Sequence, residues 1–234
     1  MTPLATLGLG LLLGLKHAFD SDHLIAVSTI VTRERSPWRS LWIGLCWGIG
    51  HTFTLLVVGL LVLGLKTEIP PLLGLSLECL VGLVLIGLGL TTLYDCWRKR
   101  IHVHRHVHAG ASHTHFHTHA QSSAHQHAHA VRLGLKPVLL GMVHGLAGSA
   151  ALMLLVLAAI PSPTLGLIYV AIFGCGSIIS MGFISLLMGV FFALATDRLS
   201  DLEHGVRIAI GTLSTAFGIW MVVEIGFFQG LFLA

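Results

Sequence analysis

Charged residues are scarce in this sequence. Asp, Glu, Lys and Arg make up only 10% of its 234 residues, whereas 55% are hydrophobic, and the mean hydropathy is +0.88. An ordinary soluble domain has about 25% charged residues, so this composition is not that of a soluble domain. It predicts an all-α integral membrane protein. A helical span needs roughly 20 apolar residues, and six stretches reach that length: 4–30, 38–65, 72–94, 137–160, 164–195 and 206–233.

The motifs of several enzyme classes are missing as well. The four cysteines form no CxxC pair, which argues against a membrane thiol oxidoreductase. There is no G-x4-G-K-S/T segment for binding ATP and no H-E-x-x-H segment of a zinc peptidase. We therefore predict no enzymatic activity, no prosthetic group and no nucleic-acid partner. Only Met1, Thr2 and Pro3 precede the first apolar run, so we expect no cleaved signal peptide.

Positive charge is distributed unevenly between the loops. The second and fourth loops hold only Lys66, whereas the first, third and fifth hold Arg33, Arg35, Arg39, Arg98, Lys99, Arg100, Arg105, Arg132, Lys136, Arg198 and Arg207. Short loops rich in Lys and Arg stay on the cytoplasmic side of a membrane. We therefore predict a multi-pass protein in the lipid bilayer whose two termini face outside and whose third loop, residues 95–136, is cytoplasmic.

Two segments of the first half resemble segments of the second. "LGLKHAFDSDHLIAV" (13–27) aligns with "LGMVHGLAGSAALML" (140–154), and "GIGHT" (48–52) aligns with "GCGSI" (174–178) at nearly the same offset. With three spans each, the halves would have opposite orientations, and inverted repeats are an architecture of transporters. We therefore predict two inverted three-helix repeats, 1–94 and 137–234, joined by the loop 95–136.

The joining loop contains a histidine tract, "HVHRHVHAGASHTHFHTHAQSSAHQHAH" (102–129), with 11 histidines among 28 residues. It shows no apolar periodicity, so we predict that it is disordered. Imidazole is a preferred ligand of borderline divalent metals such as nickel, cobalt, zinc and copper. The tract is therefore expected to bind such metals loosely, and the alternative is a low-complexity linker without a role.

Ionisable residues cluster in the first apolar stretch, which holds Lys16, His17, Asp20, Asp22 and His23. A charge within a span costs at least about 2.5–3.5 kcal/mol on insertion scales, so the cluster indicates a functional site. On a continuous helix His17, Asp20 and His23 share one face and Asp22 faces elsewhere, whereas a broken helix would let all four converge. The alternative to a functional site is mutual neutralisation, in which Lys16 pairs with Asp20.

Two imidazoles with one or two carboxylates suit Ni²⁺, Co²⁺, Zn²⁺ or Mn²⁺ better than Cu⁺. Two more histidines lie within spans: His51 in the second, and His144, the apparent counterpart of His17. The predicted metal site therefore comprises His17, Asp20, Asp22, His23, His51 and His144. Glu224, in the last span, is either a proton-coupling carboxylate or a partner in a helix–helix hydrogen bond.

His17, Asp22 and His23 form the pattern H-x4-D-H, which resembles the signature of the nickel/cobalt transporter family (NiCoT or NicO). "GLKHAFDSDHLIAV", "GIGHTFTLLVVG" and "GMVHGLAGSAALMLL" resemble its urease-accessory UreH-like branch in particular. The resemblance implies a bacterial inner-membrane secondary permease for Ni²⁺ or Co²⁺, with His17, Asp22 and His23 essential for recognition and "GHT" (50–52) as a second signature. It also implies nickel-enzyme maturation proteins as partners. The chain departs from the family's eight spans and from its acidic third motif, which "HGLAGSA" replaces.

Several functions remain in competition at this point. The leading hypothesis is a permease that carries Ni²⁺ or Co²⁺, as the transported ligand, through the intramembrane His and Asp site. The alternatives are a membrane-anchored nickel-binding accessory protein or metallochaperone, in which the tract does the work, and a metal efflux protein. A membrane metalloenzyme with a zinc-activated water is a further class, although nothing in the sequence indicates a substrate-positioning set.

The charge distribution makes a testable prediction about topology. Alkaline phosphatase is active only outside the cytoplasm, so we expect an inactive fusion after Arg105 and an active fusion after Ala234. The measurement is enzyme activity per amount of fusion protein in intact cells. The opposite pattern at either position would contradict the predicted orientation.

Overall fold

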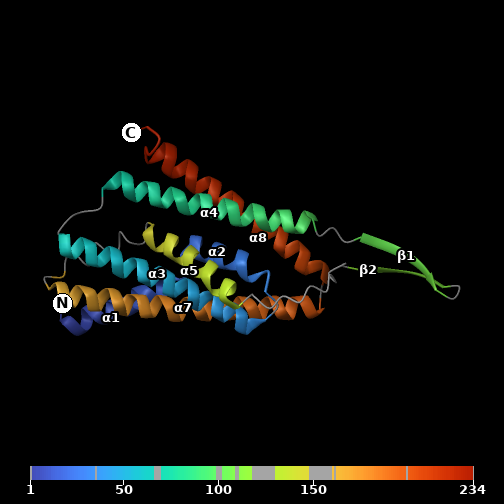
Figure 1. The fold of residues 1–234 in the computed structure, drawn as a ribbon, viewed down its shortest axis with the longest axis horizontal. Helices are drawn as coiled ribbons and strands as arrows, with labels where there is room; N and C mark the ends of the chain where they lie inside the picture. The colour runs from blue at the N-terminus through green and yellow to red at the C-terminus, as the bar shows by residue number, and fades with distance from the viewer. Residues whose placement is uncertain are drawn as a thin grey trace.

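The computed structural model describes residues 2–34, 36–65, 70–98, 102–108, 111–117, 130–147, 160, 162–198 and 200–233. Within these ranges the chain is helical apart from one β-hairpin (Figure 1). The elements are α1 (Pro3–His17), α2 (Ser21–Val31), α3 (Pro37–Leu65), α4 (Pro71–Arg98), β1 (His102–His108), β2 (Ala111–His117), α5 (Ala130–Leu146), α7 (Pro163–Arg198), α8 (Ser200–Val223) and the π-helix η1 (Glu224–Phe228).

Four helices of the described part are long and apolar enough to cross a membrane: α3, α4, α7, and α8 with its continuation into η1. They correspond to four of the six predicted spans. The first predicted span, 4–30, is not one helix, because α1 ends at His17 and α2 starts at Ser21. Of the predicted span 137–160, α5 covers the part up to Leu146, and most of the rest lies outside the described residues.

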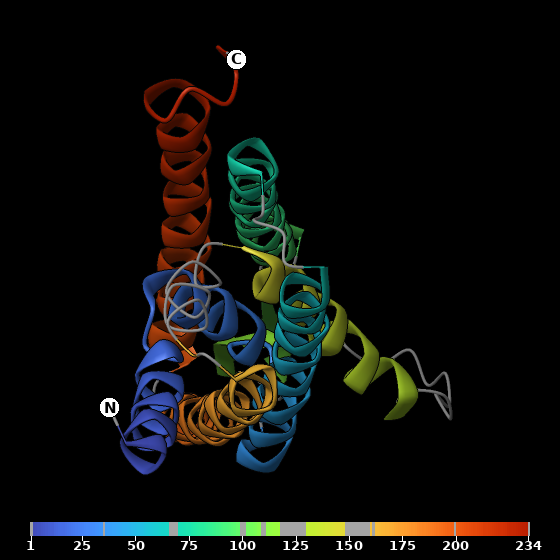
Figure 2. The same ribbon diagram turned by 90° about the vertical axis from the view of Figure 1, so that its left-hand side faces the viewer.

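The helices form two groups joined by α2. The long helices α3 and α7 pack together, with α1 against α7 and α5 against α3, whereas α4 packs against α8. Figure 2 shows α4 and α8 standing beside the other group, with α2 between the two. Ala26 and Val27 of α2 belong to the same buried cluster as Leu85 of α4, Trp47 of α3 and Met181 of α7. The short helix α2 thus contributes apolar side chains to the core that the two groups share.

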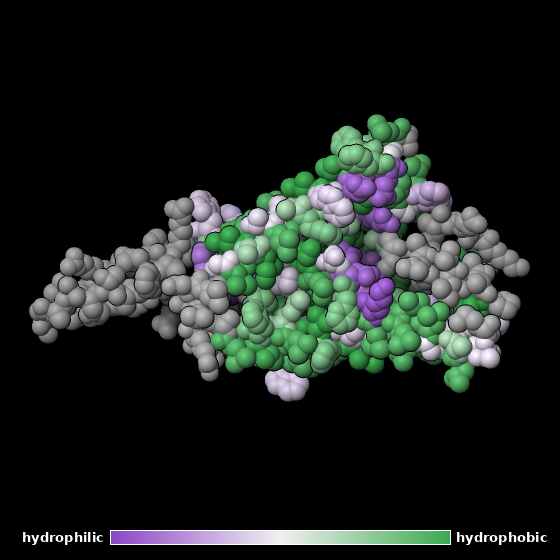
Figure 3. Space-filling model, turned by 180° about the vertical axis from the view of Figure 1, so that it is seen from behind, coloured by the Kyte–Doolittle hydropathy of each residue, from purple (hydrophilic) through white to green (hydrophobic). Residues whose placement is uncertain are grey.

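The outer surface carries many large apolar side chains, as expected for a protein that faces lipid. Large hydrophobic side chains such as Leu83, Phe183 and Leu213 are exposed, and much of the face in Figure 3 is hydrophobic. Histidine, serine and threonine side chains are buried instead, among them His51 and Ser177. Several polar side chains that could bind a ligand therefore lie inside the helix bundle.

The hairpin corrects the predicted disorder for the two segments that it covers. β1 and β2 pair antiparallel, with His102 opposite His117 and His108 opposite Ala111. The physical reason is a period of two in the sequence, since every second residue of "HVHRHVH" is histidine and residues of a strand alternate between its faces. Histidine alternates here with Val and Arg, so the segment does not alternate strictly between apolar and polar residues. A search for alternating hydropathy therefore does not detect these strands. The end of the tract, 118–129, lies outside the described residues.

Glycines let the helices approach at their crossings. A Cβ atom at Gly14 of α1 would overlap the backbone carbonyl of Phe173 in α7. One at Gly141 of α5 would likewise overlap the backbone carbonyl of Trp47 in α3. Small residues at helix interfaces allow this close packing where the hydrophobic effect does not drive association. The positions of α1 and α5, and of the histidines that they carry, therefore depend on these glycines.

We predict that Gly141→Val destabilises the protein, because overpacking of a close contact costs about 1–3 kcal/mol. Gly87→Val is the matched control, since nothing lies within 4 Å of a Cβ at this position of α4. The measurement is the midpoint of thermal denaturation in detergent, which should fall clearly for Gly141→Val and stay near the parent value for the control. An equal change in both variants would contradict the packing argument.

Candidate metal centre

The break between α1 and α2 brings two histidines together. His17 is the last residue of α1 and His23 the third of α2, and their ring centroids are 4.5 Å apart. Asp20 precedes α2 in an extended conformation, where an Asp commonly caps a helix. Its carboxylate does not cap α2 but lies 2.7 Å from His17 Nδ1. Of the two predicted arrangements, the broken helix is the one observed, and Lys16, the other predicted partner of Asp20, is exposed.

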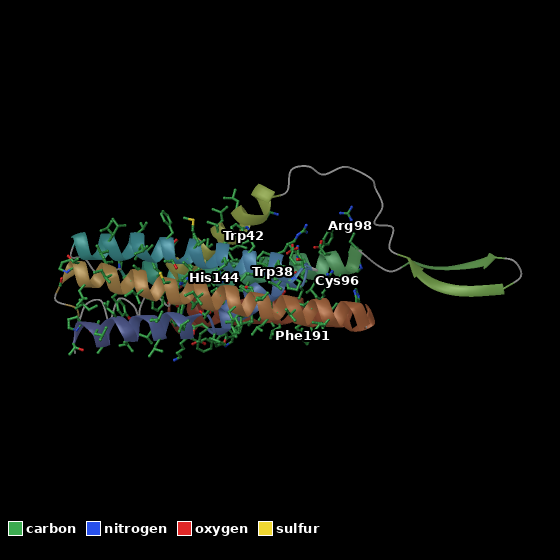
Figure 4. All side chains as sticks on the ribbon, turned by 90° about the horizontal axis from the view of Figure 1, so that it is seen from below. Trp38, Trp42, Cys96, Arg98, His144 and Phe191 are labelled. Carbon is green, nitrogen blue, oxygen red and sulfur yellow. The ribbon has the colours of Figure 1, made fainter. Side chains whose placement is uncertain are left out.

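Two further helices complete a cluster of imidazoles. His17 Nε2 lies 3.1 Å from His51 Nε2 of α3, so one of the two rings donates a hydrogen bond to the other. The ring of His23 lies 5.2 Å from that of His51 and 5.4 Å from that of His144 in α5. All four side chains are at most 6% exposed. Figure 4 shows His144 inside the bundle, far from Arg98, which lies at the end of the bundle nearest the hairpin.

Three of these histidines form the tightest group. His17, His23 and His51 each offer a ring nitrogen, and these atoms all lie within 4.8 Å of one another. His144 adjoins this group through His23, and its Nδ1 is 3.1 Å from the carbonyl oxygen of Leu140. That hydrogen bond leaves Nε2 of His144 as the nitrogen with an available lone pair, since neutral imidazole has one donor and one acceptor.

Several buried nitrogens of the cluster have no hydrogen-bond partner in the part of the chain that is described: His23 Nε2, His51 Nδ1 and His144 Nε2. Leaving a buried polar atom unpaired costs about 1–3 kcal/mol. Native structures tolerate few such atoms, and an unseen ion or water is a common explanation. The unpaired atoms therefore indicate that the cluster accommodates a ligand.

Both predicted aspartates contact the Nδ1 side of a histidine. Asp20 Oδ2 approaches His17, as described, and Asp22 Oδ1 lies 3.1 Å from His23 Nδ1. Asp22 Oδ1 and His23 Nδ1 are close enough for an ion pair, but they are not aligned for a hydrogen bond. A carboxylate behind an imidazole orients the ring and raises the basicity of its other nitrogen. The structure thus brings all six predicted residues together, with the aspartates beside the histidines.

Two aromatic residues that were not predicted as part of the site border the cluster. The Trp47 ring lies 4.7 Å from that of His144, and the Phe173 ring lies 5.5 Å from that of His17. A signal for Trp47 was present, because it stands four residues before His51 and so shares its helix face. Phe173 comes from the opposite half of the chain and could not be assigned without the packing of α1 on α7.

The urease accessory protein UreH of Bacillus sp. (strain TB-90) is 37% identical over 229 residues, which are 98% of this chain and 95% of that protein. The chain belongs to the UreH family. This confirms the resemblance to the UreH-like branch of nickel/cobalt transporters that the motifs indicated.

The chain is also similar to the chloroplast protein FOR GROWTH AND FERTILITY 1 of Arabidopsis thaliana. It is 23% identical over 218 residues, which are 92% of this UreH-family chain but only 58% of the plant protein. No family model and no solved structure matches the chain.

Proposed function

We propose that this UreH-family protein is a membrane permease for Ni²⁺ or Co²⁺, which crosses the bilayer through the cluster of His17, His23, His51 and His144 with Asp20 and Asp22. The observation that carries the proposal is the group of three buried imidazoles with ring nitrogens within 4.8 Å of one another. Membership of a family of urease accessory proteins supports a nickel-related role.

The chemistry of the donor set fits a borderline divalent cation as substrate. Neutral imidazole nitrogens are ligands of nickel, cobalt and zinc, and the hydrogen-bonded Nε2 atoms of His17 and His51 face each other at 3.1 Å. Binding of a metal requires a nitrogen with a free lone pair, so an ion that entered between these rings would require the donor ring to carry its proton on Nδ1 instead. Both rings can then bind the ion through Nε2 while they stay neutral.

Charge balance supports the same site. Bringing a dication into a medium of low dielectric carries a large desolvation cost unless opposite charge is near. Asp20 and Asp22 supply two carboxylates next to the histidines, and their side chains are 46% and 25% exposed. The negative charge thus lies between the buried imidazoles and the surroundings, where it would attract the ion and offset its charge.

The architecture in this proposal is two inverted repeats. The alignment of the halves relates positions 126 or 127 residues apart, and close backbone approaches recur at that spacing. Gly14 against the carbonyl of Phe173 corresponds to Gly141 against that of Trp47, and Gly176 against that of Leu11 corresponds to Gly50 against that of Val138. Such reciprocal contacts are expected when a pseudo-twofold axis relates two halves.

In this proposal, the permease lies in a bacterial inner membrane with the histidine tract on the cytoplasmic side, where the tract would hold metal after uptake or before efflux. Nickel-enzyme maturation proteins would be its partners. The description of the Bacillus relative as a urease accessory protein favours a second candidate, a membrane-anchored accessory protein that binds nickel for such maturation. In that case the tract, rather than the intramembrane cluster, would hold most of the metal.

We expect His17→Ala, Asp22→Ala and His23→Ala each to reduce nickel transport to background, because each variant loses a ligand or a group that orients one. His204→Ala is the matched control, since His204 lies in α8 and is not part of the cluster. The measurement is ⁶³Ni accumulation in cells, competed with Co²⁺ and Zn²⁺ and normalised to the amount of protein in the membrane. Parental flux in all three cluster variants would refute the proposed site.

Deletion of 102–129 should lower the number of nickel ions bound without abolishing transport. The register of the hairpin places histidines opposite one another at three positions: His102 and His117, His104 and His115, and His106 and His113. These residues add sites outside the bundle, whereas the selective site lies within it.

Isothermal titration of the full chain and the deletion variant, combined with ⁶³Ni flux, separates the two candidate functions. Residual nickel binding that requires His17 supports the permease. If the full chain binds nickel and the deletion variant binds none, the permease proposal is wrong and the accessory function takes its place.

A further inference from the structure

A buried serine of α7 carries a hydroxyl group and is not among the six residues of the proposed site. Ser177 is 0% exposed, and its Oγ has no hydrogen-bond partner among the residues that the structure describes. Other buried hydroxyls in these helices bond to backbone carbonyls, as Thr52 does to Gly174 and Ser180 to Gly176. Burying a hydroxyl without a hydrogen-bond partner costs free energy. The direction in which Ser177 faces relative to the histidine cluster therefore matters.

The neighbours of Ser177 on α7 determine the direction that it faces. One turn earlier, Phe173 packs against the ring of His17 from α1. Gly174, the next residue, contacts Thr52 of α3, which donates a hydrogen bond of 3.2 Å to its carbonyl oxygen. On an ideal helix Ser177 points between these two directions, about 40° from Phe173 and about 60° from Gly174.

Ser177 therefore faces the angle between α1 and α3. This is the angle in which His17 Nε2 of α1 meets His51 Nε2 of α3. Residues of α2 also belong to this region, because His23 contacts both of those rings. The unpaired hydroxyl and the unpaired imidazole nitrogens thus lie towards the same part of the interior.

The correspondence of the two halves leads to the same position independently. In the alignment of "GIGHT" with "GCGSI", Ser177 takes the place of His51. The crossing of α3 and α7 is reciprocal at these segments, because Gly174 lies against Thr52 and Gly48 lies against Ile178, the aligned residues. His51 and Ser177 thus occupy equivalent positions on the two crossing helices.

We infer that the Ser177 hydroxyl is a further group of the metal site, contributed by α7, that contacts the divalent cation or a water bound to it. The inference rests on the proposed function and extends it to the second half of the chain. A neutral hydroxyl is a weak oxygen ligand beside the imidazoles, so it keeps the donor set of the N and O type that suits nickel and cobalt. It adds no charge, which leaves the ion less tightly held than a third carboxylate would.

The test replaces the oxygen by sulfur and uses Co²⁺ as the probe. With Ser177→Cys in the purified full-length protein, we expect a thiolate-to-cobalt charge-transfer band in the near ultraviolet that the parent lacks. Ser185→Cys is the matched control, because Ser185 is also fully buried in α7 and unpaired among the described residues but lies beside Gly44, two turns further on. We also expect Ser177→Ala to weaken Co²⁺ binding about tenfold, as loss of a group that orients the site commonly does.

The outcomes separate this inference from the proposed function. If parental Co²⁺ binding is lost in His17→Ala but Ser177→Cys shows no new band and Ser177→Ala binds with parental affinity, the inference is wrong and the site stands. A band of equal strength in the Ser185→Cys control also overturns it. If the parent binds no Co²⁺ that depends on His17, both the proposed site and the inference fail. Should Ser177→Cys not fold, the affinity of Ser177→Ala decides.

Discussion

The contact between Asp20 and His17 is the interaction on which the candidate site depends. It joins the end of α1 to the residue before α2 and uses the carboxylate that would otherwise cap α2. Because Asp20 engages Nδ1, the Nε2 atom of His17 is turned towards His51. A continuous helix through 18–20 would carry His23 along the same axis and could not place its ring 4.5 Å from that of His17.

The helix break is tolerable because its backbone amides have internal partners, although the side chain of Phe19 is 58% exposed. Irregular backbone at membrane depth requires internal partners for its polar groups. Here the amides of Phe19 and Asp20 bond to the carbonyls of Lys16 and His17, and α2 then returns the chain to the apolar core. The same short helix buries Ala26 and Val27 in the core that both helix groups share, so the element that supplies His23 also contributes to the packing of the bundle.

Glycine has the complementary role of bringing the remaining histidines within reach. Gly141 and Gly145 of α5 lie against the backbone of α3 at Trp47 and His51, on either side of His144. The ring of His144 consequently packs on Trp47 and approaches His23. A side chain at either glycine would push α5 outward and separate His144 from the cluster, because packed helices have little room to adjust.

Much of the candidate site could be predicted from residue types, because ionisable groups are expensive in apolar helices and stand out there. His17, Asp20, Asp22, His23, His51 and His144 were all recognisable in this way. The sequence left open whether His17, Asp20 and His23 share one face of a continuous helix or converge at a break, and the structure shows the break. Phe173 carried no sequence signal of its own, and Ser177 had only the weak alignment of "GIGHT" with "GCGSI".

The sequence by itself determined that the chain is a helical protein with an apolar exterior, since this follows from composition and from the length of apolar runs. It also determined which side chains are available for binding a metal. Only the tertiary structure decided which nitrogens meet, which ones Asp20 and Asp22 contact, and that Trp47, Phe173 and Ser177 border them. These depend on the crossing of α3 with α7 and on the break before α2, and such contacts between distant residues arise from packing rather than from local preference.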